Sequence, residues 1–316
     1  MTNDLICIPY RDSVLQVRML RHTSPAQRGT VLYLHGGGLV FGSRDDLPEP
    51  YIRMIRAAGY TLLMPDYPLA PETQLSGILD ALFLVLKTLL RGQDGCGPVC
   101  GAPYILFGRS AGAYLSLQLT ARLLHLADED PGAALPLPKA LLCFYGYHSF
   151  ALPEFEKPSA YFRKLAPVSA ETAGRLAGGS ISPDGRFLFG GGDFDPPVVT
   201  EGPLAGRYSL YIYARQQGCW PRLVGAADPS FTIPDTLLKR FPPGFFTAST
   251  GDMDVPFRES RLLARLIPGS LFVPVYYLEH DFDRDCLRQE GTAVYTQALS
   301  FLDEQLRTAA EAASAK

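Results

Sequence analysis

The chain has 316 residues, of which 47% are hydrophobic and 19% are charged, and this balance excludes a chain that is disordered by composition. The length fits one large α/β domain, or one such domain with an inserted subdomain. The formal charge of -3 and the scattered Lys and Arg residues give no support for binding to nucleic acid, which usually requires a basic patch or stripe.

The first residues, Met1–Cys7, lack the basic region and following apolar run that mark a signal peptide. The longest apolar stretch, Ile78–Leu90, is interrupted by Asp80 and Lys87. It is too short to span a bilayer and predicts a buried helix instead. We therefore expect a cytoplasmic protein that does not associate with membranes.

Six cysteines are present, and without a secretory signal we expect them to be reduced thiols. Cys96 and Cys100 lie in a turn rich in Gly and Pro. A metal site there would need two more ligands, and the sequence offers no second cluster to supply them. We therefore expect two loop cysteines and no metal.

Short apolar, β-branched or aromatic runs alternate along the chain with longer helical patterns. The expected strands are, in chain order, Val31–Leu34, Thr61–Met64, Tyr104–Phe107, Ala140–Tyr145, Gly244–Ala248 and Leu271–Tyr277. The expected helices are Tyr51–Ala58, Leu75–Leu90, Ala113–Leu126, Phe257–Leu266 and Leu287–Leu306. Continuous apolar strands separated by helices are typical of a mainly parallel sheet that is covered on both faces.

The alternation is lost between about His148 and Arg240, where Pro, Gly and aromatic residues are frequent. A structureless loop of this length is uncommon inside a compact domain. We interpret residues 148–240 as an inserted cap, and residues 1–147 and 241–316 as the α/β core. The aromatic residues of the cap either line a binding cavity or form the cap's own core; they are Tyr208, Tyr211, Tyr213 and Trp220.

The strongest chemical signal is the segment Gly108-Arg109-Ser110-Ala111-Gly112, which lies between an expected strand and an expected helix. A serine on a sharp turn in this setting projects its hydroxyl from the carboxyl edge of the sheet. The helix N-terminus also places partial positive charge beside it. We predict that Ser110 is a nucleophile, although a Ser that merely caps a helix is a common alternative.

A second signal, His35-Gly36-Gly37-Gly38, directly follows the first expected strand. Consecutive glycines let backbone N–H groups approach a ligand closely. In acyl transfer such groups stabilise the negative oxygen that develops on the attacked carbonyl. Gly36, Gly37 and Ala111 are the natural donors. No P-loop lysine follows, which argues against a phosphate-binding loop, and we expect His35 to order the segment.

A serine nucleophile needs a base. Of the five histidines, His280 follows the last expected strand and has the chain order Ser, acid, His. His148 is a distant second choice. The acid should follow the preceding strand, where Asp252 and Asp254 both stand. We favour Asp252 because it is nearer to the strand end, and Asp254 remains the alternative acid.

These motifs together resemble the hormone-sensitive-lipase-like esterases of the α/β-hydrolase superfamily. Pro65–Glu72 is similar to the Y-R-L-A-P-E segment of those enzymes, with Pro68 where Arg is usual. Asp252–Pro256 resembles the D-x-x-V-P form of the acid loop, which favours Asp252, and His280–Phe282 is like the H-x-F end. The resemblance covers most of the sheet-forming chain and does not extend to the cap.

The resemblance implies an α/β-hydrolase fold, with a mostly parallel eight-stranded sheet flanked by helices and an inserted cap, and no metal or organic cofactor. It implies a carboxylesterase that hydrolyses acetyl or other short-acyl esters through Ser110, His280 and Asp252. Its partner would be a small ester, and homo-oligomers are possible. An amidase or peptidase with the same triad, a lyase on this fold and a non-catalytic ligand-binding protein stay open, because fold does not imply function.

Overall fold

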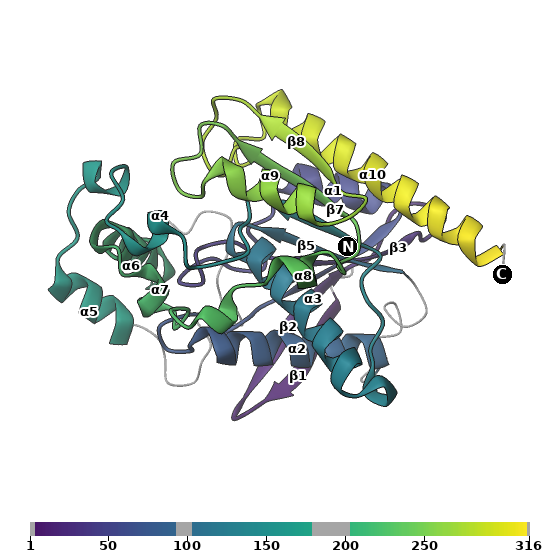
Figure 1. Ribbon diagram of the computed structural model, residues 1–316, viewed down its shortest axis with the longest axis horizontal. Helices are drawn as coiled ribbons and strands as arrows, with labels where there is room; N and C mark the ends of the chain where they lie inside the picture. The colour runs from purple at the N-terminus through teal and green to yellow at the C-terminus, as the bar shows by residue number, and fades with distance from the viewer. Residues whose placement is uncertain (1–3, 93–102, 179–202, 315–316) are drawn as a thin grey trace.

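The computed structural model describes residues 4–92, 103–178 and 203–314. Its centre is an eight-stranded sheet with the strand order β1-β2-β4-β3-β5-β6-β7-β8 (Figure 1). The strands are β1 (Asp4–Tyr10), β2 (Ser13–Leu20), β3 (Gly29–Leu34), β4 (Tyr60–Pro65), β5 (Tyr104–Arg109), β6 (Ala140–Phe144), β7 (Gly244–Ser249) and β8 (Leu271–Val275). Strands β3 to β8 pair in parallel, whereas β1 pairs antiparallel with β2 and β2 antiparallel with β4. The expected mostly parallel sheet of eight strands is confirmed.

Six of these strands coincide with the six apolar runs in the sequence. Five of them, β3 to β7, are fully buried and therefore form continuous apolar segments, whereas β8 is only partly buried. The hairpin of β1 and β2 was not among the expected strands. Its residues alternate between exposed and buried positions, and β1 lies at the edge of the sheet. The pattern of a half-exposed edge strand is weaker than that of a buried parallel strand.

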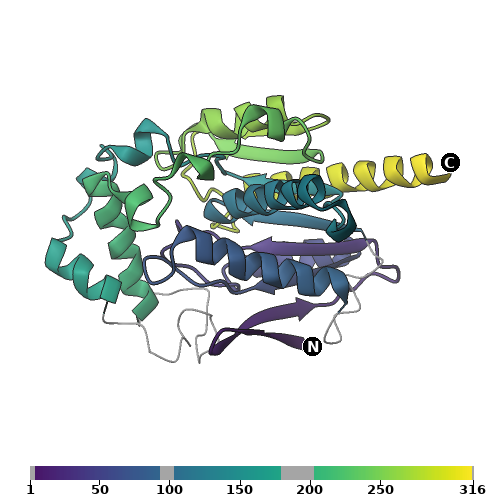
Figure 2. The same cartoon turned by 60° about the horizontal axis from the view of Figure 1, so that its bottom comes forward.

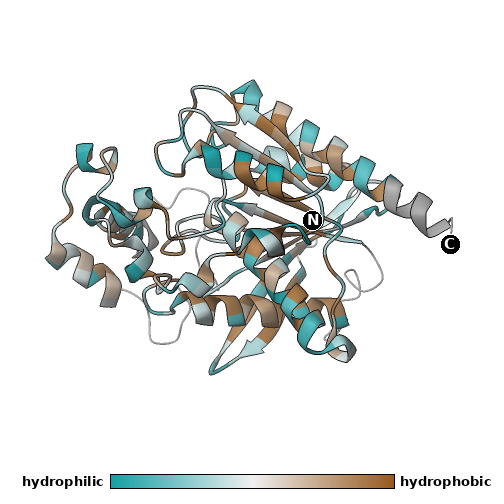
Figure 3. Ribbon diagram, in the orientation of Figure 1, coloured by the Kyte–Doolittle hydropathy of each residue, from teal (hydrophilic) through white to brown (hydrophobic). Residues whose placement is uncertain are grey.

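Helices cover both faces of the sheet (Figure 2). The helices α1 (Glu49–Ala57) and α10 (Gln289–Ser314) pack on one face, in a core with Val31, Ile105 and Phe245. The helices α2 (Leu75–Arg91), α3 (Ala111–Glu129) and α9 (Phe257–Leu266) pack on the other face. Apolar and polar residues alternate along α2 and α10, as expected for helices with one face against a sheet (Figure 3).

The interval between β6 and β7 carries only helices and turns among its described residues. The helices α4 (Pro153–Glu156), α5 (Ala170–Gly178), α6 (Pro203–Gln217) and α7 (Trp220–Leu223) gather beyond one end of the sheet (Figure 1). The helix α8 (Asp235–Leu238) instead contacts α9 beside the core. We use the word cap for α4 to α7 and the segments that join them.

The buried aromatic residues of the cap belong to the same hydrophobic cluster as residues of α2 and α3 in the α/β core. Trp220 is 1% exposed, and its ring packs against Phe150, Phe155 and Tyr211 with centroid distances of 4.7 to 5.3 Å. Tyr208, in contrast, is 45% exposed. Two of the four aromatic residues that the sequence singled out therefore form a core with neighbours, and one reaches the surface.

We predict that Leu106→Ala, which removes a fully buried side chain from β5, lowers the free energy of unfolding by about 2 to 5 kcal/mol because a cavity remains in the packed core. Leu287→Ala is the matched control, since Leu287 is 95% exposed, and should change it by less than about 0.5 kcal/mol. Urea unfolding followed by circular dichroism measures both, and equal losses would contradict the assigned core.

Candidate active site

Ser110 lies at the turn between β5, which ends at Arg109, and α3, which begins at Ala111. Its backbone has φ 52° and ψ -118°, a conformation that residues with a side chain rarely adopt. The N–H of Ser110 donates a hydrogen bond to the carbonyl of Phe144 at 2.9 Å, which ties the turn to the end of β6. The strained turn is therefore held by its neighbours, with the hydroxyl at the carboxyl edge of the sheet.

The two glycines of the motif are required by packing around this turn. A Cβ on Gly108 would lie 2.1 Å from the backbone of Gly112, and a Cβ on Gly112 would lie 2.0 Å from the carbonyl oxygen of Leu34. Because these contacts are with backbone atoms, no side-chain movement could relieve them. The glycines allow strand β5, helix α3 and strand β3 to meet where Ser110 turns.

A continuous series of hydrogen bonds joins Ser110, His280 and Asp252. His280 Nε2 lies 2.8 Å from Ser110 Oγ, and His280 Nδ1 lies 2.6 Å from Asp252 Oδ2. Because a carboxylate only accepts hydrogen bonds, Nδ1 carries the proton of the neutral imidazole, and Nε2 of that form is free to accept from the serine hydroxyl. This arrangement can deprotonate the hydroxyl while the carboxylate stabilises the imidazolium that forms.

Asp252 is itself fixed by the backbone of its own loop. Its Oδ1 accepts hydrogen bonds from the N–H groups of Asp254 at 2.8 Å and Val255 at 2.9 Å. Its side chain is only 1% exposed. The carboxylate therefore has one oxygen for the loop and the other for His280, and its orientation is set before any ligand binds.

The pKa of the His280 imidazole is raised by its surroundings. Burial lowers the pKa of His280, but the charge of Asp252 and the hydrogen bond to it raise that pKa, and the charges of Asp254 and Asp281 raise it further, to about 9. The protonated form thus contributes to folding stability below about pH 6.5, and this contribution is lost as the pH rises through about 9. The neutral imidazole of His280, which can act as the base, is therefore more populated at alkaline pH.

The glycine loop after β3 lies beside the serine. A Cβ on Gly36 would come within 3.5 Å of Ser110 Cβ, so Gly36 borders the nucleophile. Gly37 has φ 99°, and its carbonyl accepts hydrogen bonds from the N–H groups of Val40 at 2.9 Å and Phe41 at 3.0 Å. Ala111 opens α3, where the first backbone N–H groups have no partner within the helix. The three expected donors thus belong to segments that flank Ser110.

Contacts of His35 hold the glycine loop in place. It is buried, its ring stacks on Tyr67 with a centroid distance of 4.1 Å, and its Nδ1 lies 2.7 Å from the carbonyl oxygen of Gly36. The Tyr67 hydroxyl donates to the carbonyl of His35 at 2.8 Å. Burial lowers the pKa of His35. These contacts agree with an ordering role.

A buried ion pair that the sequence analysis did not identify supports the site. Arg109 Nη2 donates to Asp283 Oδ1 at 2.8 Å, and Arg109 Nε donates to the Tyr145 hydroxyl at 2.6 Å. Tyr145 and Tyr295 both donate to the Asp283 carboxylate, at 2.8 and 3.0 Å. The Tyr145 ring also packs 4.7 Å from the His280 ring. Arg109, which precedes the nucleophile, is therefore joined to Asp283, which lies three residues after His280.

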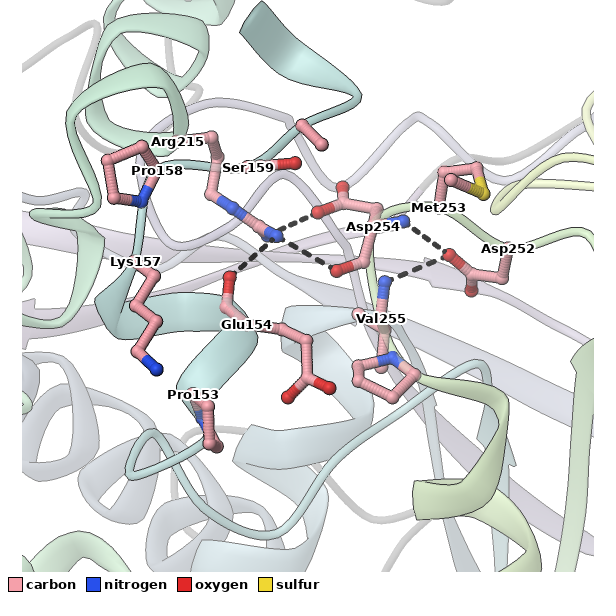
Figure 4. Close-up of a pocket in the computed structure, with 12 residues that line it drawn as sticks. Pro153, Glu154, Lys157, Pro158, Ser159, Arg215, Asp252, Met253, Asp254 and Val255 are labelled. Atoms are coloured by element: carbon pink, nitrogen blue, oxygen red, sulfur yellow. Dashed lines mark hydrogen bonds and ion pairs between the residues drawn. The ribbon is translucent and has the colours of Figure 1, made fainter.

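Asp254, the alternative acid, is directed away from His280 and toward the cap. Its carboxylate pairs with Arg215 of α6 and accepts a hydrogen bond from the Tyr211 hydroxyl at 2.8 Å. Figure 4 shows Asp254 between Arg215 on one side and Asp252 on the other. The structure thus places Asp252 against His280 and engages Asp254 elsewhere.

A pocket of about 460 Å³ adjoins this loop (Figure 4). The cap segment Pro153–Ala160 and Arg215 line one side, and the segment Asp252–Pro256 lines the other. Of the three residues in the hydrogen-bonded series, only Asp252 borders it. The pocket therefore lies on the cap side of the acid loop and does not contain the nucleophile.

Two of the remaining histidines have partners other than Ser110. His148 Nδ1 is 3.1 Å from Glu259 Oε2, and His22 Nδ1 is 2.8 Å from the carbonyl oxygen of Ser24. Within the three described segments, no group of three or more His, Cys, Asp or Glu side chains could hold a metal ion. Cys96 and Cys100 lie outside the described residues. No helix in the described part of the chain is long and apolar enough to cross a bilayer.

A signal for Arg109 was present in the sequence: a charged residue in an otherwise apolar strand that leads into the nucleophile. Its partner Asp283, and the pairing of Arg215 with Asp254, carried no local signal, because the two members of each pair are 174 and 39 residues apart. Such pairs are only visible once the strands and the cap are folded together.

Comparison with known proteins agrees with this fold. A family model described as the α/β hydrolase fold matches residues 31–174. The chain is 30% identical over 200 residues to LipR of Mycobacterium tuberculosis, which bears the name of an acetyl-hydrolase, and the match covers 60% of each protein. It is also 30% identical over 109 residues to mouse hormone-sensitive lipase, a match that covers 34% of this chain and 14% of the lipase.

The chain spans 60% of the mycobacterial relative and 7% of each of two non-reducing polyketide synthases from Penicillium that it also matches. Among solved structures, an α/β hydrolase superfamily protein from Enterococcus faecalis is 32% identical, with a TM-score of 0.74. That similarity covers 96% of this chain and all of the other. The expected fold and the resemblance to hormone-sensitive-lipase-like esterases are thereby confirmed.

We predict that Asp252→Asn lowers the pKa of His280 well below about 9, because the charge and hydrogen bond that oppose the effect of burial are weakened. A titration of the histidine signals by NMR measures the change, and the signal of His148, which has a different partner, is the internal control. A pKa of His280 that stays near 9 in this variant would show that Asp252 is not its cause.

We also predict that Arg109→Met destabilises the fold by about 3 to 5 kcal/mol, because it leaves the Asp283 carboxylate buried without its cation. The double variant Arg109→Met/Asp283→Leu should recover much of this loss, since it removes both charges. Urea unfolding gives the two free energies. Equal losses in the single and double variants would contradict a desolvated pair.

Proposed function

The chain belongs to the α/β-hydrolase superfamily, and on that premise we propose that it is a serine carboxylesterase that hydrolyses small esters with short acyl chains. The observation that carries this proposal is the hydrogen-bonded series from Ser110 through His280 to Asp252 at a strained strand–helix turn. Fold alone would not support a reaction, because this architecture hosts many functions.

In the first half of the proposed reaction, Ser110 Oγ attacks the ester carbonyl carbon while its proton moves to His280 Nε2. Asp252 keeps the imidazole oriented and stabilises its positive charge. The N–H groups of Gly36, Gly37 and Ala111 donate hydrogen bonds to the negative oxygen, a contribution worth several kcal/mol in water-excluded sites. The C–O bond then breaks, and His280 returns the proton to the departing alcohol.

In the second half, water attacks the carbonyl carbon of the acyl-enzyme while His280 Nε2 accepts a proton from it. The tetrahedral intermediate collapses, Ser110 Oγ leaves and takes the proton back from His280, and a carboxylic acid is released. The chemistry needs no group beyond these side chains and backbone N–H donors.

Crowding around the glycine loop favours a small acyl group. A Cβ on Gly38 would lie 2.4 Å from the Tyr211 ring, so the cap packs directly on the loop. The Trp220 indole N–H donates to the carbonyl of Gly38 at 2.9 Å. Phe41, at the end of the loop, packs against Tyr208 with a centroid distance of 5.2 Å. The acetyl-hydrolase name of the mycobacterial relative points the same way.

We predict that the protein hydrolyses p-nitrophenyl acetate and butyrate faster than the octanoate and decanoate esters, because we expect the cap residues that pack on the glycine loop to limit the room for the acyl chain. Ser110→Ala should lower kcat by about 10⁶ and Asp252→Asn by about 10⁴. Release of p-nitrophenol measures the rates, and Ser300→Ala, at an exposed serine on α10, is the matched control.

Two other outcomes have distinct meanings. Covalent labelling of Ser110 by a fluorophosphonate without ester turnover would move the assignment to an amidase or peptidase. A folded protein that neither turns over esters nor reacts with the label would contradict a serine hydrolase and favour a lyase or a ligand-binding protein.

A further inference from the structure

The cap helix α6 carries two buried arginines, eight residues apart, and each reaches into the core. Arg207 is fully buried and donates to the carbonyl of Val40 at 2.6 Å. It also makes two parallel hydrogen bonds to the carboxylate of Glu72, at 2.9 and 2.8 Å. This first arginine attaches α6 to the loop segments that follow β3 and β4.

The second arginine, Arg215, attaches the same helix to the acid loop. It is 1% exposed, pairs with the carboxylate of Asp254, and donates through Nη2 to the Asp254 carbonyl at 3.0 Å. The Tyr211 hydroxyl accepts from Arg215 at 2.9 Å and donates to Asp254 at 2.8 Å. The side chain and the main chain of Asp254 are therefore both held by one guanidinium.

Aromatic rings prevent the guanidinium from moving independently of the cap. Its central carbon lies 5.1 Å from the ring centroids of Phe155, Phe162 and Trp220, and 5.8 Å from that of Tyr211. Cation–π contacts of this kind stabilise a desolvated cation. The position of Arg215 consequently depends on the positions of these four rings.

The acid loop, Asp252–Pro256, links the position of Arg215 to His280. The N–H of Asp254 donates to Asp252 Oδ1, whose other oxygen lies 2.6 Å from His280 Nδ1. Figure 4 shows the dashed contacts from Arg215 to Asp254 and from the loop backbone to Asp252. An unbroken series of hydrogen bonds and covalent bonds thus runs from the cap to the base.

We propose that Arg215 is a positioning residue that fixes the orientation of the acid Asp252 through its contacts with Asp254. This inference rests on the proposed function, because it concerns the same site. A misplacement of about 1 Å in a catalytic group can lower a rate by about 100-fold, so a modest shift of the acid loop is sufficient for a kinetic effect. Arg215 touches no substrate in this role and acts only through Asp254.

The arrangement provides a matched control. Arg207 and Glu72 attach the same helix but contact neither the acid loop nor His280. Glu72→Gln weakens that pair but keeps an oxygen that accepts from Arg207, and it leaves the contacts between Arg215 and Asp254 in place. Arg215→Met can therefore be compared with Glu72→Gln, and Arg215→Lys tests rescue by a cation that retains the charge.

The experiment measures kcat and KM for p-nitrophenyl acetate, the thermal unfolding midpoint, and the downfield proton NMR resonance of His280 Nδ1–H. We expect Arg215→Met to lower kcat by about 10- to 100-fold with KM within about twofold of wild type. We expect the resonance to broaden or move in this variant. Arg215→Lys should recover part of kcat, and Glu72→Gln should keep the wild-type kcat and resonance.

Wild-type kcat and an unchanged resonance in folded Arg215→Met would overturn the proposal, as would equal losses of kcat in Arg215→Met and Glu72→Gln. Should Arg215→Met fail to fold, Asp254→Asn removes the same ion pair while it keeps the backbone N–H, and the same two readouts apply. If the wild type does not hydrolyse esters, the proposed function fails, but the resonance still tests the link between cap and acid.

Discussion

The backbone turn at Ser110 is the constraint on which the remaining architecture depends. A side-chain-bearing residue with φ 52° is stable only where its surroundings leave no alternative. Here Gly112 lets α3 approach the end of β3, and the carbonyl of Phe144 holds the Ser110 N–H from β6. Three parallel strands and one helix therefore converge on a single residue, and the glycine loop after β3 is brought beside it as a consequence.

The charges buried around this turn position the site residues more than they stabilise the fold. A buried ion pair recovers little more than its own desolvation penalty, so replacement by apolar residues is often tolerated. The pair of Arg109 and Asp283 nevertheless joins the strand that presents the serine to the loop that presents the histidine. The tyrosines that complete the network add hydrogen bonds from β6 and α10. Both halves of the proton-transfer pair are thus fixed to the same rigid sheet.

Much of this could be predicted from the sequence, because the informative features are local. Buried parallel strands are continuous apolar runs, and glycines at a strand–helix junction mark a turn that admits no side chain. The hairpin of β1 and β2 was harder to predict because one of its faces is exposed. The choice between Asp252 and Asp254 also required the three-dimensional structure, because the two residues are two positions apart on one loop. Only the folded chain shows that one faces His280 and the other faces Arg215.

The pairing of Arg215 with Asp254 has a consequence for how such proteins diversify. A cap grafted onto this core from another protein would need a cation at the position that Arg215 occupies. Otherwise the grafted cap would leave the half-buried carboxylate of Asp254 unpaired in the loop that carries the acid. Substitution of residue 215 alone or of residue 254 alone should therefore be disfavoured, although one residue belongs to a cap helix and the other to the loop after β7.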